Sequence, residues 1–294
     1  MVVGIDDTDA MWMLFRAIAI AVLAVVGLLL AAQGAWLFEA VDRGLEAVGT
    51  GVRLPRADPT RSTPVAAGGL VLGALVALIS PTRRAVSQLV TLLHELGHTV
   101  VAAALGARPS GIVLRHDASG HATARWVGTP TPWRRVALAT VAFAGLPAAA
   151  TASTAGARLL VLAGPQAVLW SFAAAGVVVA MLARSAWSLL VAGSLAGLAA
   201  LALSEAGQPF AAGAVIALLT ATAVRVVSDT GRSIGRPIDE GSDARAVAGP
   251  LFLPARLVQC VQVAVAAALS VWTLWLLFPS TSSLAQPSWP SWPS

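Results

Sequence analysis

The stretch PTRRAVSQLVTLLHELGHTVVAAALGARP, residues 81–109, decides how the whole chain is interpreted. Thr82 suits the cap of a helix, and Gly106, shortly before a proline, is a typical helix stop. A helix between them is about 34 Å long. It is mostly apolar, as a segment in lipid is, but its centre holds two histidines and a glutamate. Such groups are costly inside hydrocarbon and usually serve a function, so we expect this helix to carry a site.

The HELGH motif places His94 and His98 four residues apart, on one face of a helix and one turn from each other. Two imidazoles with this spacing can bind one metal ion, while Glu95 is turned off their line and can reach a metal-bound water. In His-Glu-x-x-His zinc sites the two histidines bind zinc and the glutamate is the general base. The pattern therefore predicts Zn2+ at His94 and His98, with Glu95 as the catalytic base for water whose pKa the metal lowers.

The composition of the chain indicates a membrane protein. Of its 294 residues, 57% are hydrophobic and 11% are charged, whereas about 25% are charged in a typical soluble domain. We therefore expect a single integral membrane domain, residues 1–294, in contact with the lipid bilayer. Its core is expected at about 64–278, and a tail rich in Pro, Trp and Ser follows at 279–294.

Apolar runs and one alternating segment predict the fold class. The runs lie at 14–36, 64–80, 83–105, 136–155, 157–182, 185–204, 208–227 and 255–278. Most are close to the roughly 20 residues that cross hydrocarbon, and the short, Gly-rich run at 64–80 suits a re-entrant segment. Residues 111–127 alternate around a turn and predict a hairpin. We expect an all-α multi-pass membrane protein with six to eight transmembrane helices and a small β-hairpin after the HExxH helix.

The arginines predict an orientation. If all eight runs cross the membrane, fifteen of the nineteen arginines lie on one side, including those in 225–256, and this side is cytoplasmic by the positive-inside rule. Arg83 and Arg84 then lie on the opposite side, in conflict with that rule. The chain is rich in Ala, Gly and Arg and has no Lys, which indicates a bacterial plasma membrane protein.

Charge and cysteine usage exclude other classes. The net charge of +5 comes from arginines scattered between apolar stretches, so no nucleic-acid partner is expected. Cys260 is the single cysteine, which excludes an internal disulfide and argues against a cysteine-based metal site.

The motif and three further segments resemble the site-2 protease group of intramembrane zinc metalloproteases, peptidase family M50, and its M50B-like branch most closely. The further segments are the hairpin at 111–127, AGLPAAA at 144–150 and GSDARAVAGPLFLPARLVQ at 241–259. The resemblance implies a zinc metalloendopeptidase that hydrolyses peptide bonds of membrane-spanning substrate proteins. It also implies that the hairpin holds an unwound substrate segment by strand addition.

A third zinc ligand is needed, because catalytic zinc usually has three protein ligands and one open position. The Leu-Asp-Gly motif that provides it in the better-known site-2 proteases is absent here. Asp229 directly follows the 208–227 run, so it can lie at membrane depth. Asp243 belongs to the family-like segment but is expected in a loop. We prefer Asp229 as the third ligand, with Asp243 as the alternative.

Other interpretations remain open. His116 and His121 flank the hairpin turn, where solvated histidines are more common than ligands. The chain is alternatively a catalytically inactive M50-like protein that acts by binding partners, although it retains Glu95. A transporter with a histidine relay is a third interpretation, but the sequence shows no internal repeat of the transporter kind. The substrate and the oligomeric state are not predicted.

Overall fold

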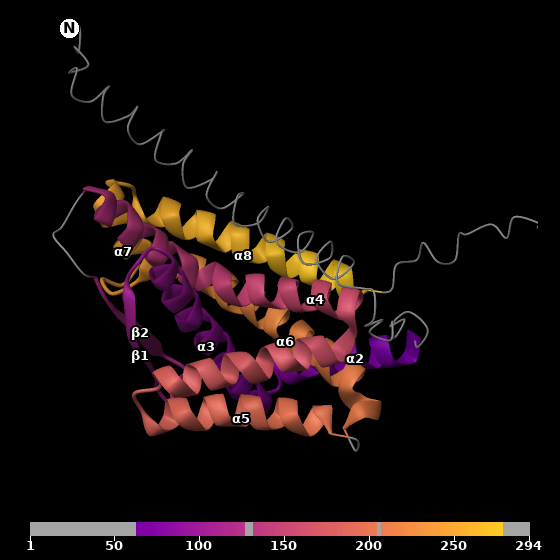
Figure 1. The fold of residues 1–294 in the computed structure, drawn as a ribbon. Coiled ribbons are helices and arrows are strands. Elements are labelled where there is room, and N and C mark those ends of the chain that lie inside the picture. Colours follow the sequence, from indigo (N-terminus) through magenta and orange to yellow (C-terminus); the bar gives the residue numbers. More distant parts are fainter. Residues whose placement is uncertain (1–62, 127–131, 205–206, 279–294) are drawn as a thin grey trace, which may run out of the picture.

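The computed structural model describes residues 63–126, 132–204 and 207–278, which form a helical bundle with one small sheet (Figure 1). The elements in chain order are α2 (Thr63–Leu78), α3 (Ser80–Ala104), β1 (Arg108–Leu114), β2 (Gly120–Arg125), α4 (Pro132–Leu182), α5 (Ala186–Leu203), α6 (Gln208–Ile234), α7 (Asp243–Leu251) and α8 (Ala255–Leu277). The apolar run at 14–36 and the tail at 279–294 lie outside the described residues. A single domain over 1–294 therefore stays a prediction.

The predicted helical class is confirmed, but the predicted number of spans is not. Among the described residues, four helices are long and apolar enough to cross a membrane: α4, α5, α6 and α8. Helices α2 and α3 meet at 92° and add a fifth span if the bent pair is one broken span. Helix α4 counts once among these four, although it contains the runs predicted at 136–155 and 157–182, and the runs at 64–80 and 83–105 form the bent pair.

The chain reverses its direction within α4, a helix of 51 residues (Figure 1). The break lies at Gly164, whose φ of 83° and ψ of 177° are not helical, and Pro165 follows it. Glycine adopts a positive φ without steric cost, and proline cannot donate the next helical hydrogen bond. The sequence placed this boundary near residue 156, so the Gly-Pro pair was the better signal.

Helix α4 continues through Pro147, and α8 covers the backbone there. Proline has no amide hydrogen, so the carbonyl of Phe143, one turn earlier, receives no helical hydrogen bond. Gln262 of α8 is 2% exposed, and its Nε2 donates to the carbonyls of Ala142 and Phe143 at 3.5 and 3.3 Å. One buried side chain of α8 therefore provides the donor that the helix itself lacks at this turn.

The predicted hairpin is confirmed. Strands β1 and β2 pair antiparallel, with Leu114 opposite Gly120 next to the turn and Arg108 opposite Arg125 at the other end. Ala118 adopts a φ of 62° in the turn, which lies between His116 and His121 as the sequence predicted. The sequence located this element because alternation and turn residues are both local signals.

The second edge of β1 is also covered. Ile112 forms a parallel bridge with Ala183, and its carbonyl accepts a hydrogen bond from the Arg184 amide at 3.0 Å. The Leu114 amide donates to Ser188 Oγ at 2.8 Å. Strand β1 is therefore paired on both sides. The outer edge of β2 has no strand partner among the residues that the structure describes.

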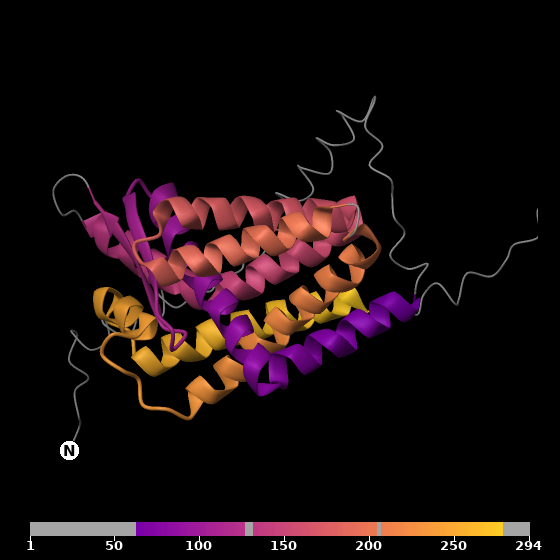
Figure 2. The same cartoon turned by 90° about the horizontal axis from the view of Figure 1, so that it is seen from below.

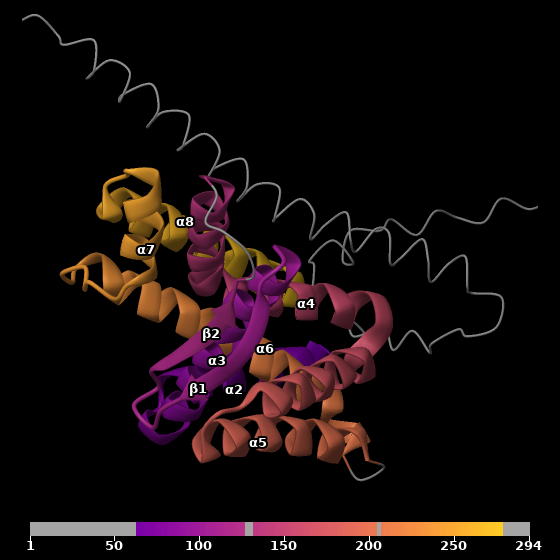
Figure 3. The ribbon, with the colours of Figure 1, turned by 60° about the vertical axis from the view of Figure 1, so that its left-hand side comes forward.

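Helix α3, which carries the HELGH motif, lies between the hairpin and α4. Figure 3 shows the hairpin lying across α3. Gln88 and Thr91 of α3 donate to the carbonyls of Arg115 and Ala118 in the hairpin, at 2.8 and 2.7 Å. On the other side, a Cβ at Gly97 would lie 2.3 Å from a side-chain carbon of α4. The absent side chain lets the two helices approach closely.

The structure contradicts the side predicted for Arg83 and Arg84. Both line one cavity with Arg225, Arg232 and Arg236 from the end of α6. Helix α2 runs beside α6, and the 92° bend after α2 brings the start of α3 to the end of α6 (Figure 2). The start of α3 therefore lies beside the end of α6, whereas the eight-span arrangement required them on opposite sides.

Candidate metal centre

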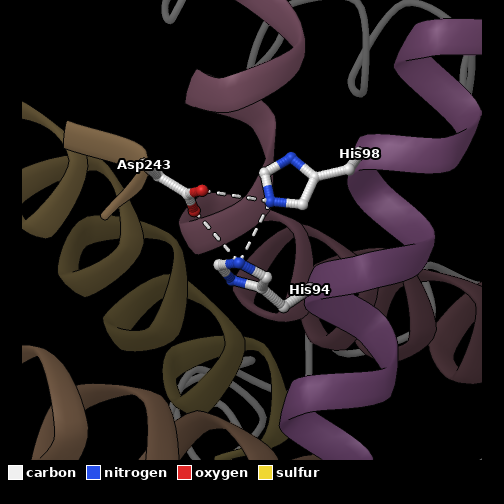
Figure 4. A group of neighbouring side chains, drawn as sticks. All are labelled: His94, His98 and Asp243. Carbon is white, nitrogen blue, oxygen red and sulfur yellow. Dashed lines mark hydrogen bonds and ion pairs between the residues drawn. The ribbon is translucent and has the colours of Figure 1, made fainter. Parts of the chain in front are cut away.

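His94 and His98 point from α3 toward Gly145 of α4 and Asp243 of α7 (Figure 4). Their Nε2 atoms are 3.1 Å apart. The Nδ1 of His98 is 2.7 Å from the carbonyl oxygen of Val141 in α4. A carbonyl only accepts, so Nδ1 carries the hydrogen and Nε2 keeps a free electron pair for a ligand. A backbone partner of this kind commonly fixes the orientation of a metal-binding histidine.

Asp243, from a segment much later in the chain, completes the cluster. It is the first residue of α7, directly after the capping residue Ser242, whose side chain accepts from the Arg245 amide. Its two carboxylate oxygens lie 3.0 Å from His94 Nε2 and 3.4 Å from His98 Nε2. The potential ligand atoms of the three residues all lie within 4.8 Å of one another.

The packing of α7 determines this position. Val247 and Ala248 of α7 are buried against Ala139 and Phe143 of α4, next to the turn of α4 that contacts His98. Burial raises the pKa of the Asp243 carboxyl, but its hydrogen bonds with the two histidines and their charge outweigh this effect and hold the pKa well below its usual range. The cluster thus favours the ionised carboxylate, which is the form that binds a metal.

Asp229 is not at the histidines, which corrects the preference for it. The structure places it on α6, where its Oδ1 lies 2.8 Å from Arg225 Nη2 and 2.9 Å from Arg232 Nη1. These arginines are four residues before and three after it, so they lie on the same face of the helix. The preference for Asp229 rested on its expected depth in the membrane. Two close guanidinium groups hold the Asp229 carboxylate away from the histidines. Asp243, at the start of α7, reaches the histidines instead.

Glu95 lies beside the histidines and faces the hairpin. It is 4% exposed, and the backbone amide of Ala122 in β2 hydrogen-bonds to its carboxylate. A Cβ at Gly120 of the same strand would lie 3.1 Å from Glu95 Cγ. Glu95 is not one of the clustered metal-binding residues, in keeping with its predicted role as a base and not a ligand.

The other two histidines lie away from this cluster. The ring of His116 packs against Trp187 of α5, with centroids 4.0 Å apart, and so helps to hold the hairpin on α5. His121 is an exposed residue of β2, opposite Val113. Neither belongs to the potential metal cluster in the described residues.

Gly145 of α4 provides the space that the imidazoles occupy. A Cβ at this position would lie 2.4 Å from His98 Cε1 and Nε2, and 2.7 Å from His94 Cε1. In the sequence, Gly145 stands out only as part of the small-residue segment AGLPAAA. Its contact with the histidines depends on the packing of α4 on α3, which no local signal reveals.

We expect Gly145→Ala to weaken metal binding about 10- to 100-fold, because the added methyl displaces both imidazoles at a typical cost of overpacking. Metal content after titration with a competing chelator measures the change. Gly193→Ala in α5 is the matched control, since a Cβ there meets no atom within 4 Å. Unchanged metal affinity in folded Gly145→Ala protein would contradict the position assigned to the rings.

Comparison with protein families identifies the class of protein. The model of the Peptidase M50B-like family matches residues 67–276, which is most of the chain. The chain belongs to this family. No curated protein and no solved structure gives a significant match. With the four candidate spans described above, the family membership makes this chain a multi-pass membrane protein of a metallopeptidase family.

Proposed function

We propose that this protein is an intramembrane zinc metalloprotease that cleaves membrane-spanning substrate proteins. The observation that carries the proposal is the meeting of His94, His98 and Asp243 on one side of Glu95, within an apolar helical bundle. Two imidazole nitrogens and one carboxylate oxygen form a common ligand set of catalytic zinc, which keeps a fourth position open. Gly145 leaves the two rings room to face the same point.

The residues of the chain have separate roles in this reaction. His94, His98 and Asp243 would hold the zinc, which would lower the pKa of water and polarise the peptide carbonyl. The Val141 carbonyl keeps His98 in the tautomer whose Nε2 faces the ligand position. Glu95 accepts the proton of the attacking water and transfers it to the leaving amine nitrogen, so one carboxylate acts as base and then as acid. Its burial at 4% exposure keeps it out of bulk solvent and suits it to this task.

The hairpin supports the choice of an unwound polypeptide as substrate. A peptide bond in a helix is shielded, so the substrate has to become extended before it is cleaved. The outer edge of β2 has no strand partner in the described part of the chain, and it passes Glu95 at Ala122. An extended segment that pairs with this edge comes to lie next to the carboxylate. We propose the edge of β2 as the site that holds it.

Metal removal tests the proposed activity. In detergent micelles, the purified chain is expected to hold about one zinc per molecule and to cleave a single-span reporter peptide labelled at both ends. We expect 1,10-phenanthroline to abolish cleavage and added zinc to restore it. The isomer 1,7-phenanthroline, which does not chelate, serves as the control. Cleavage that survives complete zinc removal would refute a metalloprotease. Stoichiometric zinc without cleavage of any reporter would favour the inactive, partner-binding alternative.

A further inference from the structure

A second polar site lies outside the metal centre, where the start of α3, the end of α6 and the turn of the hairpin meet. It is a cavity of about 440 Å³. Its charged lining residues are Arg83 and Arg84 of α3, Arg225, Asp229 and Arg232 of α6, Arg236 just after α6, and Asp117 of the hairpin turn. The metal-binding cluster does not contribute to it, so the proposed peptidase reaction leaves this cavity without a role.

The charge of the cavity is strongly positive. Five arginines face two aspartates, which leaves an excess of three positive charges. Both aspartates are already engaged, because Asp229 is bound by Arg225 and Arg232. Asp117 accepts hydrogen bonds from Ser119 within the turn. Cations gathered in one cavity repel one another unless an anion lies among them.

Arg225 has donor groups without an acceptor among the described residues. It is 9% exposed, and only its Nη2 is paired, with Asp229. Its Nε and Nη1 are buried and have no hydrogen-bond partner among the residues that the structure describes. A buried guanidinium group left partly unpaired loses much of its hydration without compensation. The planar donors of arginine match the oxygens of a phosphate group, which can bind two of them at once.

The place of the cavity in the fold indicates which phosphate it takes. It lies at the end of α6, a candidate span, and at the bend between α2 and α3. Leu78 and Ile79, at this bend, are 60% and 51% exposed. A phospholipid places its phosphate beside the end of a span and its acyl chains along such exposed apolar side chains. Basic pockets between helices at the membrane surface bind anionic headgroups in this way.

We propose that this arginine cavity binds the phosphate group of an anionic phospholipid headgroup. The bound lipid bridges α3 and α6 and contacts the hairpin turn. Thr91 lines the cavity and holds the Ala118 carbonyl, one helical turn before Glu95. Because the ligand binds only the folded arrangement, its occupancy raises the stability of the helices that carry the metal centre.

Thermal unfolding of the whole chain in uncharged detergent, at fixed low salt, tests the site. Phosphatidylglycerol is expected to raise the Tm by several degrees, whereas phosphatidylcholine and inorganic phosphate at equal concentration leave it unchanged. Arg83→Gln/Arg236→Gln is expected to raise the apparent Kd for phosphatidylglycerol about tenfold. Both side chains are exposed and neither makes a hydrogen bond or ion pair in the described structure, so the variant is expected to fold.

The matched control is Arg108→Gln/Arg135→Gln, which removes the same charge from exposed residues outside the cavity. It is expected to bind phosphatidylglycerol as the natural chain does. An equal loss of affinity in both double variants would mean nonspecific charge attraction and would overturn the proposal. An equal Tm rise with inorganic phosphate would show that the cavity binds a free anion and would overturn the proposal of a lipid ligand. No response to phosphatidylglycerol would also overturn it.

Discussion

Glu95→Gln is expected to abolish cleavage and to retain zinc. Glutamine has the same size and can still accept from the Ala122 amide, but it cannot take a proton from water. General acid–base groups accelerate reactions about 100- to 10,000-fold, so kcat should fall by a factor of at least about 100. The metal remains because its three candidate ligands do not include Glu95. Cleavage of the labelled reporter and zinc analysis of the same preparation measure both effects.

Glu240→Gln is the control for this variant, because Glu240 is an exposed carboxylate in the loop between α6 and α7. It should change neither cleavage nor zinc content. If Glu95→Gln retained full activity, Glu95 would not be the base. If it lost its zinc while staying folded, Glu95 would belong to the ligand set, and the roles of Glu95 and Asp243 would have to be reassigned.

Asp243→Ala is expected to remove most of the bound zinc and all detectable cleavage. Loss of a residue that only supports a ligand typically costs about 10- to 100-fold in metal affinity, so the loss of a direct ligand should cost more than about 100-fold. Asp229→Ala should keep its zinc, since Asp229 is held by Arg225 and Arg232. Metal titration of the two variants side by side distinguishes the two aspartates directly.

Both variants need a check of folding. Asp243 caps no other element, and α7 keeps Ser242 as its N-cap, so Asp243→Ala should unfold at a temperature close to that of the metal-free natural chain. If Asp229→Ala lost zinc and Asp243→Ala kept it, the ligand set read from the structure would be wrong. Equal losses in two folded variants would support neither aspartate as the ligand.

The parts of the site that lie within one segment were predictable from the sequence. His94 and His98 share a helix face because their spacing is fixed by the helical repeat, whatever surrounds them. The hairpin was predicted for a similar reason, because its turn and its alternation are encoded within fewer than twenty residues. These features depend on the tertiary structure only for their stability.

The parts that join distant segments were not predictable. Asp229 was preferred for its depth, but Arg225 and Arg232 on the same helix face hold its carboxylate on α6. Asp243 reaches the histidines because α7 packs on α4, a contact between segments about a hundred residues apart in the chain. The role of Gly145 follows from the same kind of packing. The family-like segment at 241–259 pointed to Asp243, but the expectation that it forms a loop outweighed that signal, because the packing of α7 on α4 is not a local feature of the sequence.

The pairing of β1 on both sides limits what this small sheet can accept. One edge of β1 is occupied by β2 and the other by residues 183–188, so the described sheet offers a single free edge. An open strand edge attracts any extended chain, including another copy of the same protein. With one free edge, the sheet has a capacity of one added strand. A strand that pairs with the edge of β2 prevents any other strand from pairing there. An unwound chain bound at this edge is therefore held in place, and a second chain cannot add to the sheet beside it.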